Sequence, residues 1–137
     1  MNRLVLFRGL PGSGKTTAAQ KLTPVCFCAD DFFKRDGRYQ WDGKLIGRAH
    51  AECKRLTREA MERKEGIVAV HNTFTRHQEM RDYLDLAREL YYEVEVVHVG
   101  SSLTDEELVI RNVHSVPLES IQRMRARWQA YQGEMVQ

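Results

Sequence analysis

Short apolar runs alternate along the chain with longer stretches in which apolar residues recur every three or four positions. The short runs have the length and continuity of strands that are buried on both faces, and they occupy residues 3–8, 25–28, 67–70 and 93–99. The longer stretches have the spacing of amphipathic helices, and they occupy residues 15–22, 44–64, 76–91, 103–113 and a final segment that Pro117 opens.

Strands that alternate with helices predict a parallel sheet, because parallel neighbours need crossover connections and these place helices on both faces. We therefore expect an α/β fold, a three-layer sandwich in which a parallel sheet of about four strands is flanked by helices. Ligands of such folds bind at the carboxyl ends of the strands. A glycine-rich turn, the pair Asp30-Asp31 and the pair Asn72-Thr73 all follow strands at this edge.

Length and composition are those of one folded domain over residues 1–137, with 42% hydrophobic and 29% charged residues. A net charge of +2 permits a nucleic-acid partner without predicting one. No apolar run approaches the roughly 20 residues of a membrane span and no signal peptide opens the chain, so we predict a cytoplasmic protein without a membrane partner. Three cysteines, an odd number, favour reduced thiols.

The strongest motif is Gly9-Leu10-Pro11-Gly12-Ser13-Gly14-Lys15-Thr16, which matches G-x-x-x-x-G-K-[ST] between a predicted strand and helix. In this phosphate-binding loop the backbone N–H groups surround a phosphate at the positive end of a helix. Lys15 is expected to reach the β- and γ-phosphates, and Thr16 to bind Mg²⁺. The predicted nucleotide-binding residues are Gly9, Pro11, Gly12, Ser13, Gly14, Lys15, Thr16 and Thr17, and the predicted cofactors are ATP and Mg²⁺.

A kinase also needs a carboxylate that orients the acceptor hydroxyl and accepts its proton. Asp30 is placed for this role after the second strand, and Asp31 is a candidate metal ligand, acceptor contact or helix cap. The segment around residues 103–120 is expected to form a helical lid whose Arg111 stabilises charge on the transferred phosphoryl group. Lys15, Asp30 and Arg111 are therefore the predicted catalytic residues.

Acceptor contacts are expected around the strand ends, from Asp31, Lys34, Arg35, Asn72, Thr73 and Arg76. Arg123, Arg125 and Arg127 form a basic stripe that either faces solvent or contacts nucleic acid. Aromatic residues near these positions, which either stack on a base or belong to the core, are Phe32, Phe33, Tyr39, Trp41 and Phe74.

With these motifs the chain resembles the polynucleotide 5′-kinases and related small P-loop kinase domains of phages and eukaryotes. The resemblance covers nearly the whole chain and rests on the phosphate loop, Ala29-Asp30-Asp31-Phe32-Phe33, Asn72-Thr73, the segment 83–92, and Arg111-Asn112-x-His114-x-Val116-Pro117. It implies a general base at Asp30 and a lid residue at Arg111.

Two positions depart from the pattern of that family. His71 stands where many relatives carry a carboxylate after the third strand, which leaves Mg²⁺ to Thr16, the nucleotide, water and one of the aspartate pair. The segment Phe32-Phe33-Lys34-Arg35 stands where the phage polynucleotide kinases carry a substrate-binding arginine, so the acceptor is not restricted to a plain 5′-hydroxyl end.

The leading hypothesis is thus a kinase acting on a hydroxyl of DNA or RNA, either a 5′-hydroxyl end or the hydroxymethyl group of a modified pyrimidine such as 5-hydroxymethyluracil. The alternatives are a kinase of small molecules such as nucleosides, sugar nucleotides or antibiotics, and an ATP-binding regulatory module without transfer activity. The sequence leaves the oligomeric state open.

Overall fold

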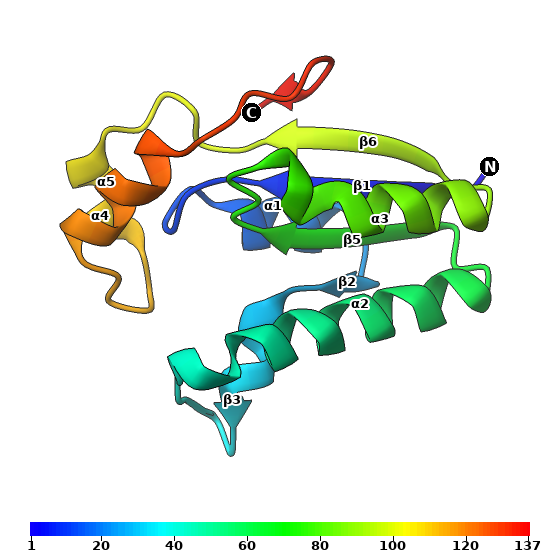
Figure 1. Cartoon of the computed structure of the whole chain (residues 1–137), viewed down its shortest axis with the longest axis horizontal. Coiled ribbons are helices and arrows are strands. Elements are labelled where there is room, and N and C mark those ends of the chain that lie inside the picture. Colours follow the sequence, from blue (N-terminus) through cyan, green and yellow to red (C-terminus); the bar gives the residue numbers. More distant parts are fainter.

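A five-stranded parallel sheet forms the centre of the computed structural model, which describes every residue of the chain (Figure 1). Strand β1 (Arg3–Arg8) lies in the middle, between β5 (Ile67–Asn72) and β6 (Glu93–His98). The edge strands are β2 (Cys26–Phe27), beside β5, and β7 (Met135–Val136), beside β6. The sheet therefore contains the strands expected from the sequence and one further strand, β7.

The two faces of β1 pack against different helices, because successive side chains of a strand point to opposite sides. Its even-numbered apolar residues join a buried cluster with α2 (Ile46–Glu62) and α3 (His77–Glu89). Its odd-numbered apolar residues join a second cluster with α1 (Lys15–Leu22). The predicted three-layer α/β sandwich is confirmed, with α1 on one face of the sheet and α2 and α3 on the other (Figure 1).

A small hairpin projects beyond the sheet between β2 and α2. The chain forms the 3₁₀ helix η1 (Ala29–Phe33), the antiparallel strands β3 (Lys34–Arg35) and β4 (Arg38–Tyr39), and the 3₁₀ helix η2 (Gly43–Leu45). Phe33 is buried in a cluster with Ala29 and Ala49, which fastens this unit to the first turns of α2. The loop or hairpin predicted between residues 34 and 44 is therefore a hairpin.

Two short helices, α4 (Asp105–Arg111) and α5 (Leu118–Ala126), form the second projection. A capping box joins Thr104 and Glu107 at the start of α4. Leu10 of the phosphate loop is buried with residues of both helices. We call α4, α5 and the residues between them the lid, and this contact attaches the lid to the loop.

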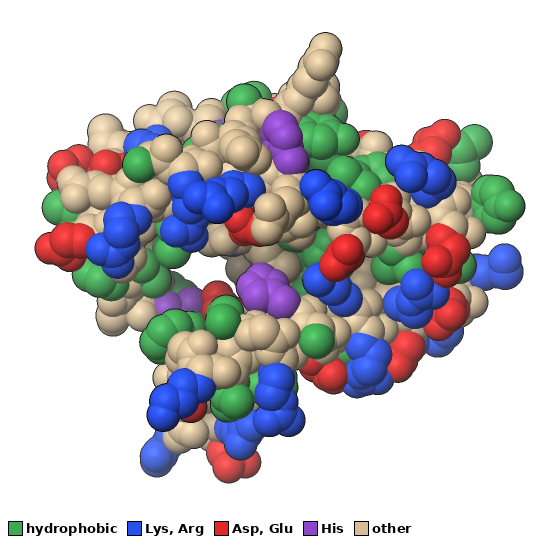
Figure 2. Space-filling view, viewed as in Figure 1, with side chains coloured by type: hydrophobic (Ala, Val, Ile, Leu, Met, Phe, Trp, Pro, Cys, Tyr) green, Lys and Arg blue, Asp and Glu red, His purple; other side chains and the backbone are tan.

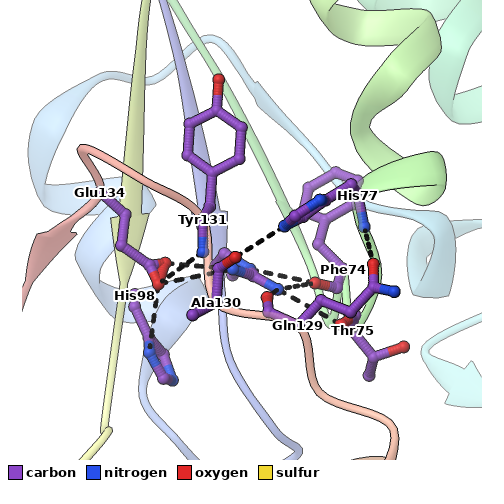
Figure 3. Close-up of polar contacts among 9 residues, drawn as sticks. Phe74, Thr75, His77, His98, Gln129, Ala130, Tyr131 and Glu134 are labelled. Atoms are coloured by element: carbon purple, nitrogen blue, oxygen red, sulfur yellow. Dashed lines mark hydrogen bonds and ion pairs between the residues drawn. The ribbon is translucent and has the colours of Figure 1, made fainter.

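Arg8, at the end of β1, is completely buried and holds the C-terminal segment in place. Its guanidinium donates to a carboxylate oxygen of Glu134 at 3.0 Å and to the carbonyl oxygens of Phe74 and Gln129 at 2.6 and 2.7 Å. The ring of Trp128 lies 4.1 Å from the guanidinium. Figure 3 shows this segment against the turn that follows β5, and its last residues continue into β7.

The three cysteines are free thiols, and Cys53 is buried while Cys26 and Cys28 are partly exposed. No cluster of three or more His, Cys, Asp or Glu side chains has the arrangement of a metal site. None of the helices has the length and apolar character required to span a bilayer.

Candidate active site

The carboxyl ends of the parallel strands open into a cleft of about 940 Å³. Its floor comes from the phosphate loop and the ends of β2 and β5, and its walls come from the hairpin and the lid. Figure 2 shows the surface hollowed between these two projections. The cleft therefore lies at the edge of the sheet where α/β folds bind ligands, and its volume is typical of a small-molecule site.

The phosphate loop presents unpaired backbone donors to this cleft. The N–H groups of Gly12 and Gly14, and those of the first three residues of α1, donate to no acceptor in the protein. Gly12 and Gly14 have φ angles of +88° and +98°, a backbone conformation that residues with a Cβ rarely adopt. The loop and the start of α1 therefore form a cradle of donors for an anion, strengthened by the helix dipole.

Lys15 follows the cradle as the first residue of α1 and lines the cleft. Burial lowers the pKa of Lys15 to about 8, although the negative charge of Asp30 opposes the shift. An anion bound in the cradle would stabilise the charged ammonium, so the loop and this side chain are suited to the same ligand.

Thr16 is hydrogen-bonded to the histidine that ends β5. Its hydroxyl oxygen lies 3.2 Å from Nδ1 of His71. His71 is only 5% exposed, and burial lowers the pKa of its ring to about 4, so the imidazole is neutral. With the ring proton on Nε2, Nδ1 accepts the hydroxyl hydrogen and leaves the lone pairs of the Thr16 oxygen free for a ligand.

Asp30 is the point at which the hairpin and the lid meet. The hydroxyl of Tyr39 donates to Oδ1 of Asp30 at 3.0 Å, and Nε2 of His114 lies 3.9 Å from Oδ2. The rings of Tyr39 and His114 stack with their centroids 3.8 Å apart. Burial and the charge of Asp30 raise the pKa of the Tyr39 phenol, so its hydroxyl remains a donor.

The neighbours of Asp30 are held by separate contacts. The carboxylate of Asp31 is half exposed and pairs with the ammonium of Lys34 at 3.1 Å. Asn72 is buried, and its side-chain oxygen accepts from the backbone N–H of Ala29 at 2.9 Å. Asn72 thereby fixes the start of η1 against the end of β5, and this sets the position of both aspartates.

The lid reaches the phosphate loop through Arg111. Its Nε donates to the carbonyl oxygen of Gly12 at 2.9 Å. The next residue, Asn112, holds the end of α4 together: its amide donates to the carbonyl of Leu108 at 3.2 Å and accepts from the N–H of Val116 at 2.8 Å. The guanidinium of Arg111 is thus held over the loop.

Most of the predicted site residues line this single cleft, namely Pro11, Gly12, Gly14, Lys15, Thr16, Thr17, Asp30, Asp31, Lys34, Asn72, Thr73 and Arg111. Four predicted residues are absent from its lining, namely Gly9, Ser13, Arg35 and Arg76. Gly9 and Ser13 pack closely against each other within the loop, where a Cβ on Gly9 would lie 2.4 Å from the Ser13 hydroxyl. Arg35 and Arg76 are exposed outside the cleft.

The basic stripe of the last helix is divided by its contacts. Arg125 pairs with Asp105 at 2.6 Å, and Arg123 donates to the hydroxyl of Ser120. Arg127 lines the cleft and donates to the hydroxyl of Thr75 at 3.1 Å.

The sequence suggested Tyr39 only as a base-stacking or core residue and His114 only as part of a family motif, but the structure places both beside Asp30. A usable signal for Tyr39 is the Asp36-Gly37 turn, because a tight hairpin there brings residue 39 opposite Lys34. His114 carries no comparable local signal, since its position depends on how the lid folds back over the cleft.

The donor set of the cleft fits a Mg²⁺ ion that is held mainly by a nucleotide. Such ions take oxygen ligands, keep several waters and need only one or two side chains when phosphates are present. The Thr16 hydroxyl oxygen, 3.2 Å from Nδ1 of His71, would be one such ligand, and the half-exposed carboxylate of Asp31 lines the same cleft.

A glycine loop with unpaired N–H groups, between the central strand and its helix, defines a P-loop nucleotide-binding protein. Residues 4–131 match the AAA domain family AAA_33, and the chain belongs to that family. The resemblance to polynucleotide-kinase-like P-loop domains expected from the sequence is confirmed at the level of family and fold.

Among curated proteins, human NEDD4-binding protein 2 is 36% identical over 135 residues, which is 93% of this chain but 8% of that protein's length. Among solved structures, the Pnkp1/Rnl/Hen1 RNA repair complex matches 92% of this chain and 43% of its own, with a TM-score of 0.72 and 19% identity. A gluconokinase from Sinorhizobium meliloti 1021 matches 98% of this chain and 81% of its own, with a TM-score of 0.65 and 14% identity. These two structures share the P-loop kinase fold with the chain.

Proposed function

We propose that this domain is an ATP-dependent kinase that transfers the γ-phosphate to a hydroxyl group of a nucleic acid. The acceptor is a 5′-hydroxyl end or the hydroxymethyl group of a modified pyrimidine such as 5-hydroxymethyluracil. The observation that carries the proposal is that the phosphate loop and the carboxylate of Asp30 open into one cleft. A P-loop that only binds nucleotide needs no carboxylate at this position, whereas transfer to a hydroxyl group does.

In the proposed reaction the acceptor oxygen attacks the γ-phosphorus and forms a new P–O bond. The bond from that phosphorus to the bridging oxygen breaks, ADP leaves, and the hydroxyl proton passes to Asp30. The loop N–H groups and Lys15 bind the phosphates, and Arg111 supplies positive charge at the transferred group. Thr16 would help to hold Mg²⁺ on the nucleotide, and the ion would then neutralise part of the phosphate charge.

The nucleic-acid acceptor is supported by two observations. The Pnkp1 structure, whose fold this chain shares, belongs to an RNA repair complex. The cleft is open between hairpin and lid (Figure 2), which suits the end of a longer chain.

A small-molecule acceptor is the second candidate, and the shared fold of the gluconokinase favours it. The stacked rings of Tyr39 and His114 also bridge the hairpin and the lid, as the walls of a closed pocket would.

A panel of acceptors separates the candidates: γ-labelled ATP is offered with 5′-hydroxyl DNA and RNA oligonucleotides, hydroxymethyluracil DNA, free nucleosides and sugars. The proposal requires higher kcat/KM on nucleic acid; equal or higher values on free nucleosides or sugars would refute it.

Replacement of Asp30 tests the chemistry itself. Asp30→Asn should lower turnover by about 100-fold or more, because a general base contributes about that factor, while ATP binding measured by calorimetry should persist. Asp85→Asn, a half-exposed surface carboxylate on α3, is the matched control and should retain full turnover. If Asp30→Asn phosphorylates at the normal rate, the domain has no base at this position, and if wild type transfers no phosphate to any acceptor, the regulatory alternative holds.

A further inference from the structure

We propose that the hairpin surface binds a single-stranded nucleic acid beyond its acceptor nucleotide, with Trp41 as a platform on which a base stacks. We define the hairpin surface as Arg35, Arg38, Trp41, Lys44 and Arg48. The inference rests on the proposed function, because the bound strand is the one whose hydroxyl reaches Asp30.

The cations of the hairpin surface are not neutralised within the protein. Arg35, Arg38, Lys44 and Arg48 are exposed, and no carboxylate lies within the 4.0 Å of an ion pair from any of them. Pairing of Arg35 with Arg38 across the two strands places two of these charges side by side. Like charges directly opposite one another destabilise a hairpin, so an anion bound here would stabilise this arrangement.

The opposite arrangement holds on the outer face of α2 and α3. There Lys54 pairs with Asp82 at 2.5 Å, and Arg58 pairs with Glu89 at 2.7 Å. Arg55 bonds to both Glu52 and Glu59 on its own helix. The hairpin surface thus carries several exposed cations without a carboxylate partner, whereas these three cations of α2 are each paired. Figure 2 shows Lys and Arg side chains gathered on the projection that carries the hairpin.

Trp41 is the aromatic residue of this region that is free to stack. Phe33 and Phe74 are each 2% exposed, and the ring of Tyr39 is covered by His114. Phe32 is partly buried against the cluster of Phe33, and the guanidinium of Arg48 lies 5.9 Å from its ring centroid. Trp41 is 61% exposed and lines the cleft that contains Asp30. A base stacked on Trp41 would therefore lie at the same cleft as the carboxylate of Asp30.

One edge of the Trp41 ring packs against Gly43. A Cβ on Gly43 would lie 2.7 Å from a ring carbon of Trp41, so the ring lies directly over the glycine backbone. The following turn is fixed as well, because the carboxylate of Asp42 accepts from the N–H of Lys44 at 3.0 Å. An exposed indole held in one orientation loses little entropy when a base stacks on it.

These features fit a single strand better than other anions. Phosphates spaced along a flexible chain can reach several separate cations, and every base has a flat face for the indole. An acidic peptide offers charge but no ring at each step. A duplex keeps its bases stacked on one another, which leaves Trp41 without a partner.

The direct test is equilibrium binding of a fluorescein-labelled ten-nucleotide single strand with a 5′-phosphate, which binds but cannot accept phosphate. Trp41→Ala should weaken binding roughly tenfold, and Trp41→Phe should restore part of the loss. Gly43→Ala should weaken binding as well, because the added methyl group displaces the ring. Gly47→Ala is the matched control, since nothing lies within 4 Å of its added Cβ, and it should bind as wild type does.

The cations are tested through the salt dependence of the same binding. Each phosphate contact on a single strand contributes about 0.7 to the slope of log K against log salt concentration. Replacing Arg35 and Arg38 together with Gln should lower that slope by more than one, whereas replacing Lys21 and Arg81, exposed cations without ion pairs elsewhere, should leave it unchanged. Thermal melts confirm that each variant is folded.

The outcomes separate this inference from the proposed function. If wild type phosphorylates oligonucleotides while the Trp41, Gly43 and arginine variants bind the strand normally, the hairpin surface is not the binding site and the kinase proposal survives. If wild type transfers no phosphate to nucleic acid, the proposed function is lost first, whatever the strand binding shows. Equal binding of duplex DNA, of an acidic peptide or of anionic lipid vesicles would also overturn the inference.

Discussion

The phenol of Tyr39 is hydrogen-bonded to the carboxylate of Asp30 in the cleft. Tyr39 comes from the hairpin and donates to Oδ1 of Asp30, which leaves Oδ2 on the side of His114. A general base accepts the proton of the acceptor hydroxyl most efficiently when its carboxylate is held in one orientation, and a hydrogen-bond donor can hold it so. We therefore regard Tyr39 as a positioning residue for Asp30.

Loss of this donor should affect turnover more than nucleotide binding. Tyr39→Phe keeps the ring stacked on His114 but removes a hydrogen bond to a charged group, so kcat should fall about tenfold while the KM for ATP stays within about twofold. Steady-state kinetics measures both constants. Tyr91→Phe, at a tyrosine that is 90% exposed, is the control, and an unchanged kcat for Tyr39→Phe would show that Asp30 needs no such support.

His71 makes stability depend on pH in a defined window. Its pKa in the folded protein is about 4, below the ordinary value of 6.5, because burial disfavours the charged ring. Between these two values the unfolded chain binds a proton that the folded protein does not, so stability falls as pH falls through this window and changes no further below it. The loss from this group is at most about 3 kcal/mol.

Urea unfolding of the nucleotide-free protein at pH 7 and pH 4.5 measures this effect. Wild type should lose more free energy of unfolding between the two pH values than His71→Gln, which keeps a polar group beside Thr16 but does not titrate. The comparison removes the contributions of His50 and His98, whose pKa values burial also lowers. An equal loss of free energy of unfolding in the two proteins would show that the His71 ring is not desolvated.

At the scale of elements, the lid and the phosphate loop are in direct contact. A Cβ on Gly12 would lie 2.5 Å from the carbonyl oxygen of Leu108 and 3.0 Å from the N–H nitrogen of Asn112. The end of α4 therefore packs against the bare backbone of the loop, and Arg111 adds a hydrogen bond to the same residue. Because of this contact, a displacement of the lid would change the shape of the phosphate cradle.

Gly12→Ala tests the coupling. The substitution adds backbone strain at a φ of +88° and also displaces the lid, so it should weaken ATP binding and lower the melting temperature. Gly37→Ala is the matched control: its φ of +76° imposes similar strain, about 1 kcal/mol, but nothing lies within 4 Å of the added Cβ. Equal ATP affinity in the two variants would mean that the lid contact has no influence on the loop.

At the scale of the whole molecule, the C-terminal segment completes the sheet and covers the end of β1. Its hydrogen bonds to Arg8 join residues 126 positions apart in the chain, and the N–H of Gln137 donates to the carbonyl of His98 at 2.9 Å. Figure 3 shows Gln129 and Glu134 of this segment close to Phe74 and Thr75 of the turn after β5. Arg8 directly precedes the phosphate loop, so the hydrogen bonds from the C-terminal segment to Arg8 fix the start of the loop.

Glu134 is the counter-charge of the buried Arg8, with side chains that are 11% and 0% exposed. Glu134→Gln should lower the free energy of unfolding by about 3 kcal/mol, because it leaves a buried cation without a carboxylate. Glu89→Gln removes the surface pair with Arg58 and should cost less than about 1 kcal/mol. Denaturant titration of both variants provides the measurement, and equal losses would show that the Arg8 site is open to water.

Much of this arrangement follows from local sequence. The apolar runs predict the positions of four of the five strands of the sheet. The glycines with Lys15 and Thr16 predict the phosphate loop. Both predictions depend on residue types at fixed spacing along one segment of the chain. The order of strand, aspartate pair and helix also places Asp30 at the correct edge of the sheet. The sequence alone determines these features, because the residues of each motif are close neighbours in the chain and need no contact with distant segments.

Contacts between distant segments were decided only by the tertiary structure. Strand β7 is a two-residue element whose residues show no strand period and whose position depends on pairing with β6. In the sequence Arg8 has the pattern of an ordinary polar residue at a strand end. Only the structure shows that it is buried in contact with Glu134 and Trp128. In the same way, exposure of Trp41 and burial of Phe33 are set by which side of the hairpin meets α2. No short-range pattern contains that information, because packing and charge compensation depend on three-dimensional proximity.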